Sequence, residues 1–172
     1  MAKDNFAACV AWTLAQEGGF QDDPNDEGNY RPDGTLVGTN FGISAAAYPT
    51  LDIRALTQAD AEAIYQRDYW TRVQGEYLPL GVDLVVFDEA VNAGVSRSAK
   101  LLQAALGVVA DGDIGPVTLY RATNMDPAEL VQSFTSFRAG FYAHMANAAR
   151  YSVPLIQRAR DCEKAALAML GG

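Results

Sequence analysis

The chain has 172 residues, of which 49% are hydrophobic and 20% are charged, and its formal net charge is −8. This length and composition predict one soluble folded domain with a packed core. The negative charge disfavours nucleic-acid binding, which needs a basic patch to neutralise phosphates. The longest apolar runs, near residues 84–87 and 165–170, fall far short of the roughly 18–20 residues that span a bilayer.

The N-terminal part combines one helix with a loop-rich region. The first helix is predicted over residues 4–16, and the two glycines that follow Glu17 end it. Residues 21–42 are rich in proline, glycine and polar residues, which indicates loops and turns. Within this region a Pro-Asp-Gly turn separates residues 29–31 from 35–37, which predicts a short β-hairpin.

The rest of the chain is predicted to be helical. The expected helices cover residues 58–70, 82–91, 97–106, 116 onward, 127–148 and 154–170. Thr57 and Ser96 are the expected N-caps of two of them, Pro116 suits a first helical turn, and Pro154 is expected to open the last helix. The fold class is therefore mainly α, with about seven helices and a small β-hairpin region near the N-terminus.

Residues 1–172 are expected to form a single domain with two parts. Residues 1–95 hold the first helix, the hairpin loop and the helices beside them, and residues 96–172 form a helical lobe. Two such parts fit within one domain of this length, whereas two full domains do not.

Neither a metal site nor a disulfide framework is predicted. His144 is the only histidine, and Cys9 and Cys162 are the only cysteines, whereas a zinc site needs a cluster of such ligands. The cysteines lie in the first and last predicted helices, where two reduced, buried thiols are favoured over a bridge. Asp111 and Asp113 lack the further ligands of a calcium loop and indicate a polar turn. No cofactor is expected.

Glu17 is the candidate catalytic acid. The first helix carries an apolar stripe formed by Phe6, Val10, Thr13 and Leu14. Glu17 follows Phe6 by eleven residues, which returns it to within about 20° of the same direction. It also lies at the negative end of the helix dipole. Both effects favour the protonated carboxyl that a glycosidase needs as general acid. The alternative is a solvent-exposed or capping glutamate.

Asp26 and Thr39 are candidates for a second role at the same site. Asp26 follows Glu17 by nine residues, and a second carboxylate can hold or activate water, or stabilise positive charge on a sugar ring. Asp22 and Asp23 compete with Asp26 for this role. The hydroxyl of Thr39 can orient water. The alternatives are an Asx-turn aspartate and a locally bonded hydroxyl.

The order of these motifs resembles the glycoside hydrolase family 108 muramidases. Glu-Gly-Gly-Phe at 17–20, an Asp-rich loop, and Gly-Thr-Asn-Phe-Gly-Ile-Ser at 38–44 are similar to the family's Glu-Gly-Gly-Tyr, its Asp before Gly-Gly, and its Thr-Asn-Tyr-Gly-Ile. Residues 64–70 and 87–94 resemble the next two blocks, and residues 101–118 resemble the peptidoglycan-binding segment of that family. The resemblance covers about residues 6–165.

The resemblance implies a lysozyme-like helical fold and cleavage of the β-1,4 bond between N-acetylmuramic acid and N-acetylglucosamine. Glu17 matches the family's catalytic glutamate, Asp26 its aspartate and Thr39 its threonine. The same order and the nine-residue step resemble phage T4-type lysozymes. In one departure, the short Gly-Gly linker of the family is replaced by residues 27–38, with Gly-Asn at 28–29, which is expected to reshape one rim of the cleft.

Three further residues are candidates for substrate binding. Tyr65 and Trp70 are aromatic residues that can stack on sugar rings or belong to the core. Asn92 can hydrogen-bond an acetamido group, or tie a helix end to a loop as a buried amide.

The leading hypothesis is a peptidoglycan hydrolase of the muramidase or endolysin type. The expected partners are glycan strands, and the chain is expected to be a monomer. The acidic charge opposes approach to an anionic wall and favours an alternative, a catalytically weak muramidase-like binding or scaffolding module. A third hypothesis is a lytic transglycosylase, which forms an anhydro product without water. No basic and apolar leader is recognisable, so we expect synthesis in the cytoplasm and action on the wall after export or holin-type release.

Overall fold

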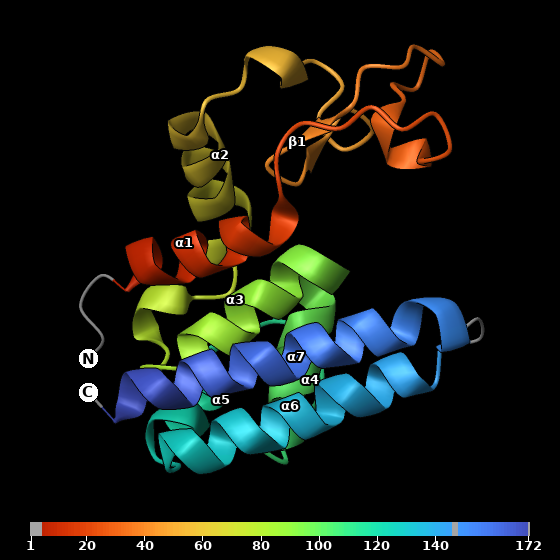
Figure 1. Ribbon diagram of the computed structural model, residues 1–172. Coiled ribbons are helices and arrows are strands. Elements are labelled where there is room, and N and C mark those ends of the chain that lie inside the picture. Colours follow the sequence, from red (N-terminus) through yellow and green to blue (C-terminus); the bar gives the residue numbers. More distant parts are fainter. Residues whose placement is uncertain (1–4, 146–147, 172) are drawn as a thin grey trace. The chain divides into compact units, whose positions relative to one another are not determined.

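The computed structural model describes residues 5–145 and 148–171 (Figure 1). Within this part the chain forms seven α-helices, short 3-10 and π segments, and one two-stranded antiparallel sheet. The prediction of a mainly α fold with a small β region is therefore confirmed. The chain divides into two compact units: unit 1 takes Met1–Cys9 and Arg67–Gly172, and unit 2 is Val10–Gln66.

Helix α1 (Phe6–Glu17) begins in unit 1 and ends in unit 2. Its predicted stripe is confirmed by burial, since Val10 and Thr13 are buried whereas Ala11 and Ala15 are exposed. Gly18 follows with a φ of +75°, a left-handed conformation that ends helices and that glycine adopts without steric cost.

The sheet of unit 2 is a tight hairpin. Strand β1 (Thr39–Asn40) pairs with β2 (Ile43–Ser44), with Thr39 opposite Ser44. The two turn residues both have positive φ, +51° at Phe41 and +75° at Gly42, as two-residue hairpin turns prefer. The short hairpin predicted between residues 29–31 and 35–37 is present as a single antiparallel bridge between Tyr30 and Leu36, with flanking backbone hydrogen bonds from Arg31 to Thr35 and from Val37 to Asn29.

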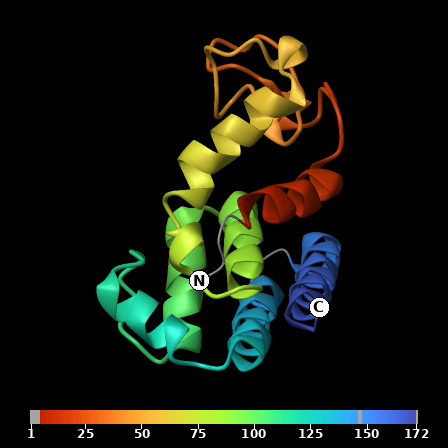
Figure 2. The ribbon, with the colours of Figure 1, turned by 90° about the vertical axis from the view of Figure 1, so that its left-hand side faces the viewer.

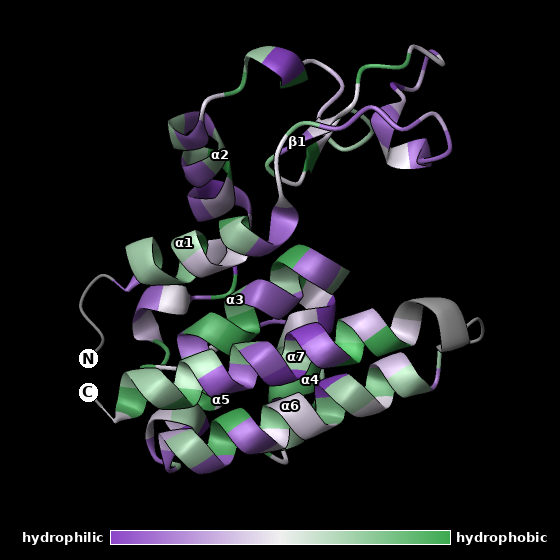
Figure 3. Cartoon of the chain, viewed as in Figure 1, coloured by the Kyte–Doolittle hydropathy of each residue, from purple (hydrophilic) through white to green (hydrophobic). Residues whose placement is uncertain are grey.

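The remainder of unit 2 consists of a polar loop and helices. The loop carries a 3-10 turn (Glu27–Asn29), and Figure 3 shows hydrophilic residues prevailing along it. A second 3-10 turn (Ile53–Ala55) precedes α2 (Gln58–Tyr65). Thr57 caps α2 as predicted, because Thr57 and Asp60 form a reciprocal capping box. The helix predicted to Trp70 continues as a π-helix (Gln66–Trp70), which belongs to unit 1 from Arg67 onward.

Unit 1 is a helical bundle formed by five α-helices and a 3-10 turn. Their bounds are Gly75–Tyr77 for the turn, and α3 (Val82–Ala93), α4 (Val95–Ala105), α5 (Pro116–Thr123), α6 (Pro127–Ala143) and α7 (Ala148–Leu170). Helices α6 and α7 pack along each other, and α3 packs against α4, α6 and α7 (Figures 1 and 2). Residues 81–90 are all buried, so α3 is the central helix of this unit.

Three predicted helix ends in unit 1 are corrected. Helix α4 begins at Val95 after Gly94, so Ser96 lies inside the first turn and is not the cap. Helix α6 ends at Ala143 and not at residue 148. Pro154 lies inside α7. A proline there removes one backbone hydrogen bond, and the packing of α7 against α6 and α3 supports the helix through this position.

Both cysteines are free and buried in unit 1. Burial is the main cause that raises the pKa of each thiol, and it does so for Cys9 and Cys162 alike. The prediction of two reduced, buried thiols is confirmed. Among the described residues, no helix has the length and apolar character needed to cross a membrane.

Candidate active site

The carboxyl group of Glu17 lies against the turn of the β1–β2 hairpin. A Cβ atom placed on Gly42 would come within 2.9 Å of Glu17 Oε2 and 3.0 Å of Glu17 Cγ. Only glycine leaves space for the carboxyl at this point, and its φ of +75° also favours glycine. A glycine after Phe41 thus has a physical reason, because Gly42 lets the hairpin approach the end of α1 closely.

Tyr65 holds this turn in place. Its hydroxyl donates a hydrogen bond of 2.8 Å to the backbone oxygen of Phe41, and its ring is buried. The same hydroxyl would lie 2.6 Å from a Cβ on Gly42. Tyr65, predicted as a candidate for sugar stacking or for the core, therefore packs beneath the turn that contacts Glu17.

Thr39 lies on the same hairpin and is tied to a pair of side-chain amides, those of Asn29 and Gln21. Its hydroxyl donates to Asn29 Oδ1 at 2.7 Å. Asn29 and Gln21 bond reciprocally: Asn29 Nδ2 donates to Gln21 Oε1 at 2.7 Å, and Gln21 Nε2 donates to Asn29 Oδ1 at 3.1 Å. Asn29 Nδ2 also donates to the backbone oxygen of Asp23 at 2.9 Å. The side-chain amide of Asn29 is thus fully bonded and buried.

Asp26 lies at the other end of the amide pair. Gln21 Nε2 donates to Asp26 Oδ2 at 3.0 Å, and the backbone N–H of Gly28 donates to Asp26 Oδ1 at 2.9 Å, which caps the 3-10 turn. Each carboxylate oxygen therefore accepts one hydrogen bond, and the two bonds fix the orientation of the group. The structure therefore joins Asp26 to Thr39 through Gln21 and Asn29.

The two competing aspartates have other contacts. Asp22 Oδ2 forms an exposed ion pair of 2.7 Å with Arg54. Asp23 accepts hydrogen bonds from the backbone and side chain of Asn25, and these bonds lower its pKa. Both carboxylates belong to surface contacts of the loop. Asp23 bonds Gln21 and Asn29 through its backbone, whereas Asp26 accepts a bond from Gln21 through its side chain.

Trp70 lies in the core of unit 1. Its indole packs against Phe6 and Phe87, with ring centroids 5.5 and 5.6 Å apart, and it is 5% exposed. It also covers Gly75 so closely that a side chain there would overlap the indole. These contacts show that the indole of Trp70 packs in the core of unit 1.

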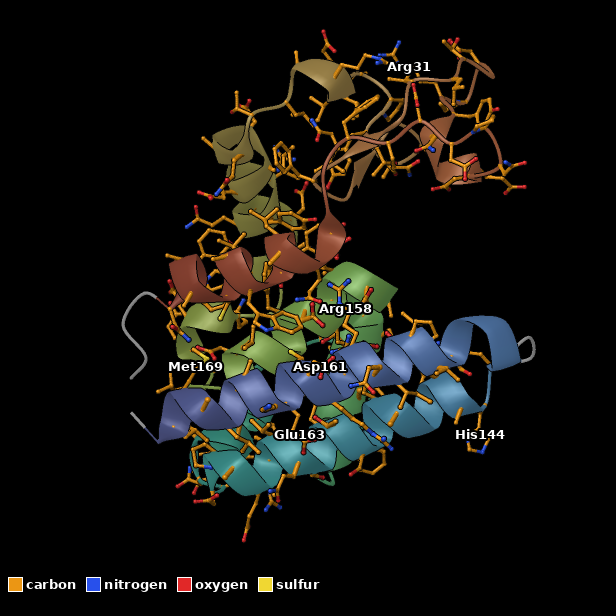
Figure 4. All side chains as sticks on the ribbon, viewed as in Figure 1. Arg31, His144, Arg158, Asp161, Glu163 and Met169 are labelled. Carbon is orange, nitrogen blue, oxygen red and sulfur yellow. The ribbon has the colours of Figure 1, made fainter. Side chains whose placement is uncertain are left out.

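Asn92 belongs to a buried ionic cluster in unit 1. Asp88 pairs with Arg138 at 2.8 Å and with Arg158 at 2.6 Å, where Arg158 reaches across from α7 (Figure 4). Glu89 Oε2 lies 2.5 Å from Arg138 Nε. With its amide oxygen turned towards the two guanidinium groups, Asn92 accepts from Arg138 at 2.8 Å and from Arg158 at 3.0 Å.

Burial dominates the electrostatics of Glu89 in this cluster. Loss of solvation raises the pKa of Glu89 although Arg138 and the Tyr142 hydroxyl, which donates to Glu89 at 2.7 Å, act in the opposite direction. The cluster joins α3, α6 and α7, and Asn92 is one of its bonded members. Asn92 lies in unit 1, whereas Glu17, Asp26, Thr39 and Tyr65 lie in unit 2.

In the segment 101–118, the buried side chain of Gln103 is hydrogen-bonded to the turn at residues 111–113. Gln103 Nε2 donates to Asp111 Oδ1 at 2.6 Å and to the backbone oxygen of Asp113 at 2.9 Å, and Gly112 N–H donates to Gln103 Oε1 at 2.9 Å. The Asp-Gly-Asp sequence is thus a polar turn, as predicted. Within the described residues no group of three His, Cys, Asp or Glu side chains is arranged to hold a metal ion.

Sequence reasoning missed Gln21 and Asn29. Asn29 carried one usable signal, since it stands where the resembling family has glycine, and a polar side chain at such a point needs a partner. Gln21 carried no signal of this kind, because Asp26, Asn29 and Thr39 lie five to eighteen residues away and meet it only through the loop and the isolated bridge to Thr39.

Residues 10–94 match the family model described as Glycosyl hydrolase 108. A solved structure described as Brucella abortus SagA is similar to the chain with a TM-score of 0.83 and 30% identity, over 96% of this chain and 95% of that one. No curated protein matches the chain. The chain belongs to the Glycosyl hydrolase 108 family.

Proposed function

We propose that the chain is a peptidoglycan hydrolase that cleaves the β-1,4 bond between N-acetylmuramic acid and N-acetylglucosamine. The observation that carries the proposal is the connected set of residues in unit 2. Glu17 contacts the hairpin at Gly42, the same hairpin presents Thr39, and Asn29 and Gln21 join Thr39 to Asp26. The family match over residues 10–94 supports the reaction class.

Glu17 is the proposed general acid. It is partly buried at the end of α1, and its carboxyl lies beside Gly42 of the hairpin turn. A carboxyl held in such a place can transfer its proton to the leaving glycosidic oxygen as the C–O bond breaks. Asp26 and Thr39 are proposed to act on the attacking water. This assignment prefers Asp26 to Asp22 and Asp23, because only the Asp26 carboxylate accepts a bond from the amide pair.

Among the three predicted substrate-binding residues, the contacts support indirect roles. Tyr65 bonds the turn that carries Gly42, so we propose that it shapes the site from beneath. Trp70 is packed by Phe6 and Phe87, and Asn92 is bonded to two arginines. We propose that both stabilise unit 1.

The C-terminal helices are proposed to contact the glycan outside the catalytic residues. An apolar groove of about 530 Å³ lies between α4 and α6, lined in part by Leu101, Phe137 and Phe141. Phe137 is 46% exposed, and an exposed aromatic ring offers a stacking surface for a sugar. We further propose that the enzyme works as a monomer on the wall, after export or holin-type release.

Product analysis tests the reaction. The enzyme is incubated with purified sacculi, and the released muropeptides are analysed by mass spectrometry. Hydrolysis adds one water per cleaved bond and gives reducing N-acetylmuramic acid ends, whereas a lytic transglycosylase gives anhydro ends that lack this water. Anhydro products would replace our proposal by transglycosylation. Tight binding to sacculi with no released product would replace it by a binding module.

A further inference from the structure

We propose that Asn29 and Gln21 are positioning residues that fix Thr39 as a hydrogen-bond acceptor and orient the carboxylate of Asp26, both towards the hydrolytic water. The inference rests on the proposed function and goes beyond it, because it assigns a direction to each hydrogen bond at the site. It starts from the two amide groups, whose donors and acceptors are all used.

The reciprocal pairing of the amides fixes which atom faces Thr39. The two N–H groups of the Asn29 amide donate to Gln21 Oε1 and to the backbone oxygen of Asp23. Its oxygen therefore faces Thr39, and it accepts the hydroxyl hydrogen at 2.7 Å. A hydroxyl has one hydrogen and two lone pairs. Once that hydrogen is bound by Asn29, Thr39 Oγ1 can only accept a hydrogen bond from any further group.

The same pairing fixes the other end of the network. Gln21 Nε2 has two hydrogens, one donated to Asn29 Oδ1 and the other to Asp26 Oδ2. The backbone N–H of Gly28 donates to the other oxygen of Asp26, so a donor on each oxygen fixes the orientation of this carboxylate. Backbone bonds of 2.8 Å in both directions between Gln21 and Thr39 hold the two ends at a constant separation.

The consequence is that Thr39 Oγ1 and the Asp26 carboxylate both present acceptors to a water, because the donors of Thr39, Asn29 and Gln21 are already used. The water donates one O–H to Thr39 Oγ1 and the other to the carboxylate of Asp26, so that its lone pair is free to attack the anomeric carbon. As the new C–O bond forms, the leaving oxygen takes the proton of Glu17, and the water proton passes to a carboxylate. Bonds and protons balance without a further reactant.

The proposal is tested by a double-mutant cycle with kcat and KM measured on soluble glycan strands. The variants are Thr39→Val, Asn29→Ala and their combination. We expect each single variant to lower kcat about 10- to 100-fold with KM within threefold, since small misplacement of a reacting group costs about this much. Because Asn29 acts through the Thr39 hydroxyl, the double variant should lose no more than the worse single one.

A pH profile supplies a second readout that does not depend on folding of the Asn29 variant. Gln21→Glu replaces the donor to Asp26 with a carboxylate, and neighbouring carboxylates raise each other's pKa. We expect the acid limb of the kcat profile to move up by about one pH unit. Gln58→Glu, at an exposed position of α2 in the same unit, is the matched control and should leave the profile unchanged.

Three results would overturn the inference. The first is a loss of kcat in the double variant equal to the product of the two single losses. The others are an acid limb of Gln21→Glu at the same pH as in wild type, and full activity of Thr39→Val. The proposed function is tested separately by Glu17→Gln. If Glu17→Gln is inactive while these variants behave as wild type, the inference fails and the function stands. If Glu17→Gln is fully active, the function fails first.

Discussion

Glu17 and Gly42 are in direct contact, and the contact leaves no space for a side chain on Gly42. A Cβ there would lie 2.9 Å from Glu17 Oε2 and 2.6 Å from the Tyr65 hydroxyl. The hairpin turn and the end of α1 therefore depend on each other. The pair links a backbone feature of the β1–β2 turn to the residue proposed as the acid.

Gly42→Ala is expected to lower kcat about 100-fold, because the new methyl group displaces the Glu17 carboxyl. Gly34→Ala is the matched control. Gly34 has a similar φ of +84° with nothing within 4 Å of a Cβ, so it shares the backbone strain without the contact. Both variants should lose about 1–2 kcal/mol of stability from the left-handed backbone alone. Equal activities of the two alanine variants would show that the contact has no catalytic consequence.

Replacing the loop aspartates one at a time should distinguish their roles. Asp26→Asn is expected to lower kcat by about 100-fold or more, since it removes the carboxylate proposed to accept a hydrogen bond from the attacking water. Asp22→Asn breaks only an exposed ion pair with Arg54, and Asp23→Asn changes an exposed turn. Both should stay within about twofold of wild type. Initial rates on sacculi measure this, and a larger loss in Asp22→Asn would move the role to that residue.

Local patterns in the sequence were sufficient to predict that the helices form and that Glu17 lies at the end of α1, although three helix ends were wrong. The stripe that includes Val10 and Thr13 fixed which side of α1 is buried, and the glycines fixed its end. The amide pair could not be predicted, because it depends on the contact of Gln21 with Asn29 and Thr39 across a loop. The partners of Asn92 were missed for the same reason, since Arg138 and Arg158 are 46 and 66 residues away in sequence.

Arg138→Met is expected to destabilise the protein by about 3–5 kcal/mol. The change leaves Asp88 and Glu89 buried with fewer partners, and breaking a buried ion pair on one side has a cost of this size. Arg54→Met removes the exposed pair with Asp22 and should cost no more than about 1 kcal/mol. Urea unfolding of both variants measures the difference. Similar losses would mean that the buried cluster contributes little.

Asp83 should make the protein less stable as pH rises. Burial raises the pKa of Asp83 above its ordinary 3.8, although Asn5 donates to it at 3.0 Å. The folded state then binds this proton more tightly than the unfolded state, so stability is full below about pH 3.8 and falls as pH rises to the folded pKa.

Asp83→Asn removes this dependence. The Tm of the variant minus that of wild type should therefore increase from pH 4 upwards and then level off. Differential scanning fluorimetry at closely spaced pH values measures the difference, which cancels the titration of all other groups. A difference that is constant or decreases with pH would contradict the assigned direction.

The most direct measurement of the central claim is muropeptide release from purified sacculi by wild type and Glu17→Gln, at matched concentrations and with unfolding curves recorded for both. Glutamine keeps the size of the side chain near Gly42 but has no acidic proton to give. We predict unchanged folding and a loss of release by about 100-fold or more. Wild-type release by the folded Glu17→Gln protein would contradict the claim that Glu17 is the general acid.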